Sequence, residues 1–320
     1  MKGTALVDAR LAAAVTEQTA PLRRIWLCAD DYGISPAVNT AIRDLIMRGR
    51  LNATSVMVLP PSSSRSEAVS LSILNTVAKR AAIGLHVTLT APFAPSSPNF
   101  QPLAGGVFLP LKKLLKRAMR RKLDARSLAN EVTAQFKSFH SLFGRAPDFV
   151  DGHQHVHLFP QIRDAVLAAA KEHAPQAWVR QCGSGLPFHK RIFDRKALLL
   201  DYLSREFRRQ AGQLGIRTNP GFAGTYDFAS SEPFATRFPR FLDKLPDGGL
   251  IMCHPGFVDA ELERLDPLTG LREQEFAYFN GDEFLAVLGQ HHVVLAEEPR
   301  AVPASENTPA RVPGTEPEHA

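Results

Sequence analysis

Short apolar runs recur along the chain, and most are followed by a segment in which apolar residues have helical spacing. The run at 24–29 and the run at 249–253 are the clearest examples, and turn residues bound both. Apolar runs of about four to eight residues are typical of strands that are buried on both faces. We therefore predict strands over 24–29, 53–59, 82–90, 148–152, 177–180, 216–219, 249–253 and 292–295.

The segments between these runs predict helices. Ser35 and Pro36 supply a capping hydroxyl group and a first-turn proline, and Gly49 ends the helix that they begin. A Pro/Gly-rich loop over 91–108 is long enough to have a function. The remaining helices are expected at 65–79, 111–126, 127–143, 160–173, 193–213, 233–244 and 276–288.

This alternation of strand and helix, repeated seven or eight times, predicts an α/β fold with a parallel sheet. A distorted, closed or nearly closed (β/α) barrel of seven or eight strands fits best, with the functional site at the carboxyl ends of the strands. A doubly wound open sheet is the alternative, but the sequence has no glycine-rich phosphate loop.

Composition is that of a globular protein, with 44% hydrophobic and 22% charged residues in a chain of 320. We predict one domain over 23–297, a flexible extension over 1–22 and a disordered tail over 298–320, which has five prolines and no aromatic residue. No apolar run approaches the roughly 20 residues that span a bilayer. Residues 1–20 contain Asp8 and Glu17 and do not resemble a secretory signal.

The net charge of +6 comes from one segment. Residues 111–126 hold eight basic residues and one acidic residue, which is +7, so the rest of the chain carries 6 − 7 = −1. Leu111, Leu114, Leu115 and Ala118 make this segment a basic amphipathic helix. Either it is a solvated helix that covers the core, or it docks to an acidic partner or an anionic membrane surface. Because the charge is local, we do not expect nucleic-acid binding.

The cysteines, Cys28, Cys182 and Cys253, are odd in number and far apart, which argues against a disulfide framework. We interpret them as small buried side chains, with a thiolate role as the alternative. A cytoplasmic protein is expected, and a homodimer is an open alternative for its assembly.

The stretch from Asp151 to His157, with histidines at 153, 155 and 157, carries the strongest chemical signal. Side chains alternate along an extended chain, so the three imidazoles would lie on one side, next to a carboxylate. Several imidazoles are costly to bury together without a ligand. The pattern predicts a metal site but does not choose among His153, His155 and His157.

Other polar residues follow other predicted strands. A catalytic metal ion needs about three protein ligands, which Asp31, His86 and one histidine of the 153/155/157 set can supply. Asp30, next to Asp31, is a candidate base that should stay ionised beside a cation. His254 is a candidate acid that would protonate a leaving group from the opposite side.

Four motifs, "ADDYGIS", "IGLHVTLT", "VDGHQHVHLFPQI" and "MCHPGF", occur in this order between Arg24 and Leu295. They resemble the YdjC-like family of carbohydrate deacetylases, which includes chitooligosaccharide deacetylases and hopanoid-associated HpnK proteins. The resemblance implies a distorted (β/α) barrel and a magnesium ion, although an Asp/His/His set suits zinc at least as well.

The resemblance also assigns roles. It implies that Asp31, His86 and His153 bind the metal, that Asp30 is the catalytic base and that His254 is the proton donor. It leaves His155, His157 and the neighbouring Asp151 to support the ligands or to contact the substrate. Arg180 would orient Asp30 or bind substrate. Tyr32 replaces a phenylalanine that is usual in the family and would add a hydroxyl group beside the site.

The expected function is metal-dependent hydrolysis of the N-acetyl group of an amino sugar, in which an activated water molecule attacks the carbonyl carbon. One alternative is a metal-dependent hydrolase of a phosphoester or another amide. Another is a carbohydrate-binding protein without catalysis, which would not need a base and an acid beside the metal ligands.

Overall fold

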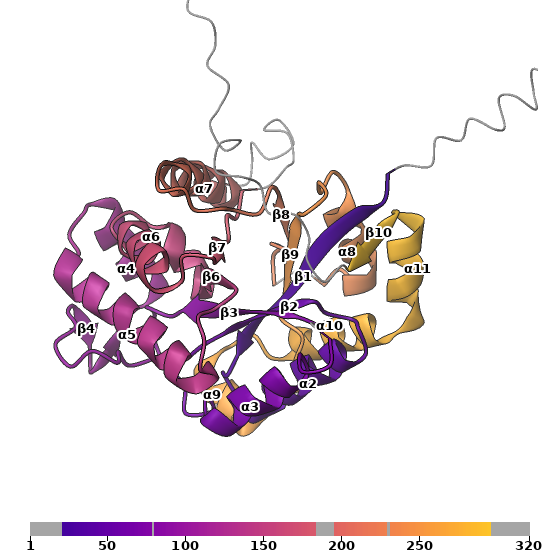
Figure 1. The fold of residues 1–320 in the computed structure, drawn as a ribbon, viewed down its shortest axis with the longest axis horizontal. Helices are drawn as coiled ribbons and strands as arrows, with labels where there is room; N and C mark the ends of the chain where they lie inside the picture. The colour runs from indigo at the N-terminus through magenta and orange to yellow at the C-terminus, as the bar shows by residue number, and fades with distance from the viewer. Residues whose placement is uncertain (1–20, 79, 184–194, 229–230, 296–320) are drawn as a thin grey trace, which may run out of the picture.

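A computed structural model describes residues 21–78, 80–183, 195–228 and 231–295. Its centre is a sheet of eight parallel strands in this part of the chain, which curves into a distorted (β/α) barrel (Figure 1). The strands are hydrogen-bonded in the order β7-β6-β3-β2-β1-β9-β8, and β10 pairs with the first residues of β1. They are β1 Arg23–Tyr32, β2 Ala53–Val56, β3 Ala82–Val87, β6 Phe149–Gly152, β7 Trp178–Val179, β8 Phe222–Ala223, β9 Leu250–Cys253 and β10 Val293–Leu295.

The predicted fold class is therefore confirmed, although several strands are shorter than predicted. The strand expected at 53–59 ends at Val56, and the one expected at 82–90 ends at Val87. The strand expected at 216–219 is reduced to a single parallel bridge between Thr218 and Val179, and β8 follows it. This bridge to β7 brings the two ends of the strand order towards one another.

Helices surround the sheet, and a small antiparallel hairpin lies in the long loop after β3 (Figure 1). The hairpin strands are β4 Leu103–Ala104 and β5 Val107–Phe108. The helices are α2 Pro36–Met47, α3 Arg65–Ile73, α4 Leu111–Met119, α5 Ala125–Phe143, the 3₁₀ helix η1 His153–Leu158, α6 Ile162–His173, α7 Arg195–Gln213, α8 Phe234–Leu242, α9 Ala260–Leu265, α10 Gly270–Asn280 and α11 Asp282–Gln290.

Three predicted helices were wrong in their bounds. The helix expected over 65–79 ends at Ile73. The helix expected over 111–126 ends at Met119, because Asp124 caps a new helix by accepting the Ser127 N–H at 2.6 Å. The helix expected over 276–288 is divided at Gly281, so that α10 begins at Gly270, before the predicted start.

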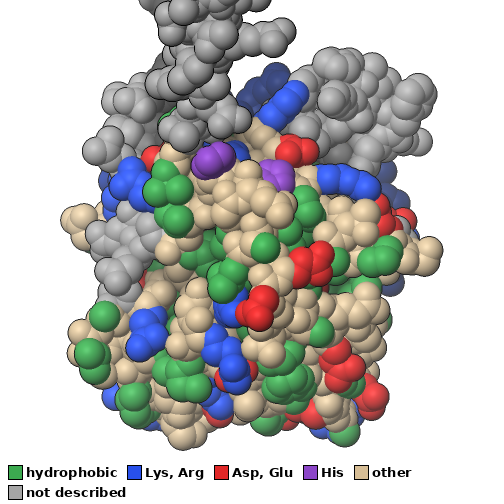
Figure 2. All heavy atoms as spheres, turned by 90° about the vertical axis from the view of Figure 1, so that its right-hand side faces the viewer, with side chains coloured by type: hydrophobic (Ala, Val, Ile, Leu, Met, Phe, Trp, Pro, Cys, Tyr) green, Lys and Arg blue, Asp and Glu red, His purple; other side chains and the backbone are tan. Residues whose placement is uncertain are grey.

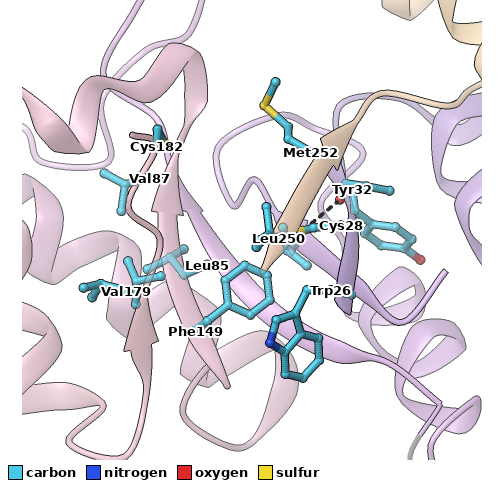
Figure 3. Close-up of a cluster of buried hydrophobic side chains, with 14 of the residues drawn as sticks. Trp26, Cys28, Tyr32, Leu85, Val87, Phe149, Val179, Cys182, Leu250 and Met252 are labelled. Carbon is cyan, nitrogen blue, oxygen red and sulfur yellow. Dashed lines mark hydrogen bonds between the residues drawn. The ribbon is translucent and has the colours of Figure 1, made fainter. Parts of the chain in front are cut away.

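Aromatic side chains fill the amino-terminal end of the barrel interior. Trp178 stacks on Phe149 with ring centroids 4.5 Å apart and lies 5.7 Å from the Trp26 ring. Figure 3 shows Trp26 and Phe149 side by side between their strands. Gly84 makes room for this packing, because a Cβ atom there would lie 2.5 Å from the Phe149 ring. An apolar plug thus closes the barrel below the polar residues at the other strand ends.

The basic segment forms α4 and the turn after it. Its apolar residues Leu114 and Ala118 are buried, and its basic side chains are exposed, so the predicted amphipathic helix covers the core. Docking through this surface stays a prediction. The opposite side of the molecule, with α11 and β10, mixes basic, acidic and hydrophobic side chains (Figures 1 and 2).

No helix among the described residues is long and apolar enough to cross a membrane. The tail expected over 298–320, and the extension expected over 1–22 except for its last two residues, lie outside the described residues.

Candidate active site

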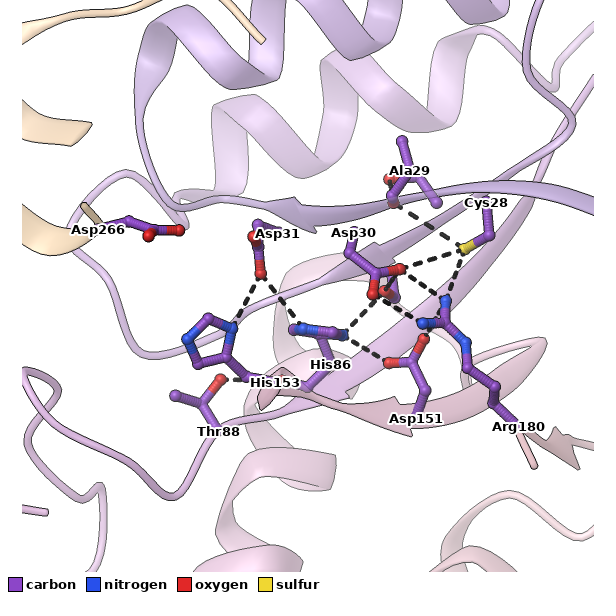
Figure 4. A network of polar contacts seen from close by, with 12 residues as sticks. Cys28, Ala29, Asp30, Asp31, His86, Thr88, Asp151, His153, Arg180 and Asp266 are labelled. Atoms are coloured by element: carbon purple, nitrogen blue, oxygen red, sulfur yellow. Dashed lines mark hydrogen bonds and ion pairs between the residues drawn. The ribbon is translucent and has the colours of Figure 1, made fainter. Parts of the chain in front are cut away.

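The end of β1 brings two adjacent carboxylates to one place. Side chains of a regular strand alternate between faces, so neighbours such as Asp30 and Asp31 would normally diverge. Here the register between β1 and β2 shifts between Ala29 and Tyr32, and Asp31 has a φ angle of 67°. A β-bulge of this kind re-aims side chains. Both carboxylates are buried as a result and belong to one polar network (Figure 4).

Asp31, His86 and His153 form the candidate metal-binding cluster. One oxygen of Asp31, Oδ1, lies 3.2 Å from Nε2 of His86 and 3.0 Å from Nδ1 of His153. The three potential ligand atoms lie within 4.8 Å of one another, and all three residues are buried. Two imidazole nitrogens and one carboxylate oxygen are a suitable donor set for a divalent transition metal or zinc.

The second nitrogen of His86 is held from behind. Its Nδ1 lies 2.6 Å from Oδ1 of Asp151 and 2.9 Å from Oγ of Ser55. Burial alone would disfavour protonation, but Asp151, Asp31 and Asp30 together raise the pKa of His86 to about 10. A proton and a metal cation compete for the same nitrogen, so the negative charge that raises this pKa also favours a bound cation. Asp151 therefore contacts a proposed ligand, and its supporting role stays a prediction.

Asp30 is paired with Arg180. The guanidinium group donates to both carboxylate oxygens, from Nη1 to Oδ2 at 2.7 Å and from Nη2 to Oδ1 at 2.6 Å. Burial opposes ionisation of Asp30, but Arg180 and the nearby His86 and His254 hold its pKa well below the usual range. The lowered pKa favours the ionised form of Asp30, and Arg180 fixes the direction of its carboxylate. The roles expected of the two residues stay predictions.

His254 follows β9 and lies near Asp30. It is close enough for its charge to contribute to the lowered pKa of Asp30. Its backbone N–H donates to Glu275, and the Phe228 ring lies edge-on at 5.8 Å from the imidazole. Its Nδ1 is buried and has no hydrogen-bond partner within the described ranges. An imidazole near Asp30 is a group of the type that transfers protons in hydrolysis.

The three histidines after Asp151 do not share one face, so the extended conformation predicted for them was wrong. The strand ends at Gly152, and the chain enters η1 with positive φ angles at Gln154 (55°) and His155 (60°). His153 reaches Asp31, whereas the other two turn towards Cys182, whose Sγ lies 3.5 Å from Nδ1 of His155. His153 alone of the three contacts the candidate cluster.

His157 has a supporting place in the barrel. Its Nε2 lies 2.8 Å from the backbone oxygen of Arg180, so that it braces the end of β7. Burial lowers the pKa of His157 to about 4 and that of His155 well below the usual range. Both rings are therefore neutral near pH 7.

The hydroxyl group of Tyr32 was expected beside the site, but it lies next to Glu67 and Arg43. The Tyr32 ring points away from the barrel interior (Figure 3). Its hydroxyl group donates to Oε2 of Glu67 at 3.0 Å and accepts from Arg43 at 2.9 Å. The expectation was wrong because the bulge in β1 turns Tyr32 towards α2 and α3.

Cys28, Asp30 and Asp151 form a second cluster of potential ligands, but the guanidinium group of Arg180 already contacts all three. Nη2 of Arg180 lies 2.6 Å from Oδ2 of Asp151 and 3.0 Å from Sγ of Cys28. Burial raises the pKa of the Cys28 thiol and likewise that of Cys182 and Cys253. All three cysteines are free, buried and protonated, as small packing residues would be.

Two residues near the site were not predicted. Arg272 donates to Oδ2 of Asp31 at 2.7 Å, and Glu275 accepts from the N–H of His254 at 2.5 Å. Both belong to α10, which the apolar pattern placed too late in the sequence. A signal was present, since Arg272, Glu275 and Phe279 follow helical spacing and would place two charges on an inward face.

Comparison with known proteins gives one consistent family. A sequence profile described as YdjC-like protein matches residues 24–290. The chain is 30% identical to a chitooligosaccharide deacetylase of Serratia marcescens over 239 residues, which is 73% of this chain and 82% of that protein. It is also 30% identical to a chitooligosaccharide deacetylase of Yersinia pestis (strain Pestoides F) over 237 residues, with the same coverage of 73% and 82%.

A crystal structure with a similar fold is among the matches. It is described as a cellobiose-phosphate cleavage protein of Enterococcus faecalis V583 and superposes with a TM-score of 0.65 at 23% identity. The match covers 86% of this chain and 97% of that one.

Proposed function

Because this chain belongs to the YdjC-like family, we propose that it is a metal-dependent carbohydrate deacetylase that removes the acetyl group from an N-acetylated amino sugar. The names of the two relatives support chitooligosaccharides as the first substrates to test. The observation that carries the proposal is that an Asp/His/His donor set lies in one buried polar network with the carboxylate of Asp30, and that His254 is near enough to Asp30 to lower its pKa.

Asp31, His86 and His153 would hold the metal ion. Once bound, a divalent cation would polarise the acetyl carbonyl group and lower the pKa of a water molecule. Asp151 keeps His86 oriented through a hydrogen bond to Nδ1 of the imidazole, as carboxylates behind metal-binding histidines do.

Asp30 would act as the base. Its carboxylate is held in one orientation by both nitrogens of the Arg180 guanidinium group and stays ionised. It accepts a proton from the attacking water while a C–O bond forms at the acetyl carbon. His254 then donates a proton to the amide nitrogen as the C–N bond breaks, which gives acetate and the free amino sugar.

The experiment that tests this function is acetate release from chitooligosaccharides and from other N-acetylated amino sugars. We expect release by the wild-type protein, loss of release on chelation and recovery when metal is added back. Asp30→Asn is expected to lose nearly all activity and to retain the metal, because Asp30 is not one of the three candidate ligands. Full activity in Asp30→Asn would contradict the role of the base.

The same assays decide between the alternatives. Phosphate release from phosphorylated sugars without acetate release would indicate a phosphoesterase. Sugar binding without turnover, under any metal, would indicate a binding protein. Metal analysis of protein purified without added metal separates magnesium, which the family resemblance implies, from zinc, which the donor set suits at least as well.

A further inference from the structure

The inner face of α10 carries two charged side chains that are both fully buried. Arg272 and Glu275 each have 0% exposed surface and lie three residues apart, on the same side of the helix. Burying a charge is unfavourable unless it is paired and hydrogen-bonded. The hydrogen-bond partners of these two side chains therefore indicate the role of the helix.

Arg272 fixes the carboxylate of Asp31. Its Nη2 donates to Oδ2 of Asp31 at 2.7 Å and to Oδ2 of Asp266 at 2.6 Å, and its Nε donates to the backbone oxygen of Leu268 at 2.9 Å. The other oxygen of Asp31, Oδ1, is the one that faces His86 and His153. Arg272 thus holds one oxygen of the Asp31 carboxylate while the other oxygen faces the two imidazoles.

Glu275 fixes the chain at His254. Its Oε2 accepts the N–H of His254 at 2.5 Å, and its Oε1 accepts the hydroxyl group of Tyr226 at 2.5 Å. Two residues further on, the N–H of Gly256 donates to the backbone oxygen of Arg272 at 3.1 Å. The segment that carries the His254 imidazole is therefore tied to α10 at both ends.

We propose that one turn of α10 is a positioning element for the whole site, in which Arg272 orients Asp31 and Glu275 orients His254. Neither residue contacts the reacting atoms. Because both lie on one rigid helical turn, the metal-binding side and the proton-donating side of the site are held at a fixed separation. This inference rests on the proposed function for its catalytic consequences.

A purely structural role would have a different signature. If Arg272 and Glu275 only stabilised the packing of α10, their loss would lower the unfolding temperature and leave kcat of the folded protein unchanged. If they position the site, kcat falls in folded protein while KM stays nearly constant, because orientation matters most in the transition state.

The Glu275 arm measures acetate release from chitobiose by Glu275→Leu, Glu275→Gln and Glu273→Leu. Glu273 is exposed on the same helix and is the matched control. We expect kcat to fall about a hundredfold in Glu275→Leu and about tenfold in Glu275→Gln, whose amide has one acceptor oxygen for two donors, with KM within about twofold. The control should match wild type.

Wild-type kcat in Glu275→Gln, or a KM that rises as kcat falls, would overturn this arm. Glu275→Gln is isosteric, so it decides the question even if Glu275→Leu does not fold.

The Arg272 arm titrates Zn²⁺ alone into metal-free Arg272→Lys by calorimetry, with the exposed Arg264→Lys as control. Lysine keeps the charge but cannot hold Asp31, Asp266 and Leu268 together, so we expect Kd to rise about tenfold. An unchanged Kd would overturn this arm. The titration needs no substrate, so it stands even if the wild-type protein releases no acetate, which would refute the proposed function alone.

Discussion

The guanidinium group of Arg180 holds both oxygens of Asp30, at 2.7 Å from Nη1 and 2.6 Å from Nη2. Its Nη2 also lies 2.6 Å from Asp151, whose other oxygen lies 2.6 Å from Nδ1 of His86. One buried cation therefore links the proposed base to a proposed metal ligand. A change in the position of the Arg180 guanidinium group should therefore alter the orientation of both Asp30 and His86.

Replacement of Arg180 by lysine should lower kcat about a hundredfold, because an ammonium group cannot hold both oxygens of a carboxylate in the way a planar guanidinium group does. The charge is kept, so the buried carboxylates stay compensated and the protein should fold. Acetate-release kinetics and thermal unfolding measure the two effects separately.

The control for Arg180→Lys is Arg217→Lys. Arg217 is exposed, and its side chain donates to the backbone oxygen of Gln176. Gln176 lies just before β7, whereas Arg180 follows β7. The control should keep wild-type kcat. If Arg180→Lys does so too, bidentate pairing is not needed for catalysis.

The barrel itself was predictable from the sequence because its strands are strongly apolar. β1 and β9 are buried throughout except for the first two residues of β1, and each ends in a polar motif that a parallel sheet must bring to one edge. The convergence of Asp30 and Asp31 was not predictable, since it depends on a bulge that sequence periodicity does not reveal.

The histidine pattern shows the limit of periodicity most clearly. Histidines at 153, 155 and 157 have the period of a strand, but positive φ angles at Gln154 and His155 turn the chain instead. Local propensity gives no reason for these angles, which accompany the contacts of His153 with Asp31 and of His157 with Arg180. Only the family resemblance selected His153.

Alanine variants of His153 and His155 test that selection. His153→Ala should weaken Zn²⁺ binding to the metal-free protein at least about tenfold, because it removes one of three proposed ligands. His155→Ala is the matched control from the same motif, and its Kd should change by less than about threefold, as its ring faces Cys182 and Phe222. The reverse order of effects would assign the ligand to His155.

A methyl group added at Gly84 should destabilise the barrel. Its Cβ atom would lie 2.5 Å from the Phe149 ring, which is itself stacked on Trp178 and cannot easily move. We expect Gly84→Ala to lower the free energy of unfolding by about 1–3 kcal/mol, as overpacking usually does. Urea unfolding measures this change. Gly270→Ala, where no atom lies within 4 Å of the added Cβ, is the control and should unfold as wild type does.

The buried histidine His157 should make the stability of the metal-free protein depend on pH in the acidic range. Burial lowers its folded-state pKa to about 4, below the unfolded value of roughly 6.5. The unfolded chain therefore binds the proton first as the pH falls. The stability that the neutral ring contributes is present above about pH 6.5 and is lost as the pH falls towards 4, by about 3 kcal/mol in total.

This window is separate from that of the carboxylates. Asp30 and Asp31 have lowered folded-state pKa values, so the stability that they contribute is lost only below the unfolded value of about 4. Urea unfolding between pH 4 and pH 7 should show a steeper loss of stability in the wild type than in His157→Gln, which has no titrating ring at this position. Equal slopes in the two proteins would show that another group is responsible for the acid sensitivity.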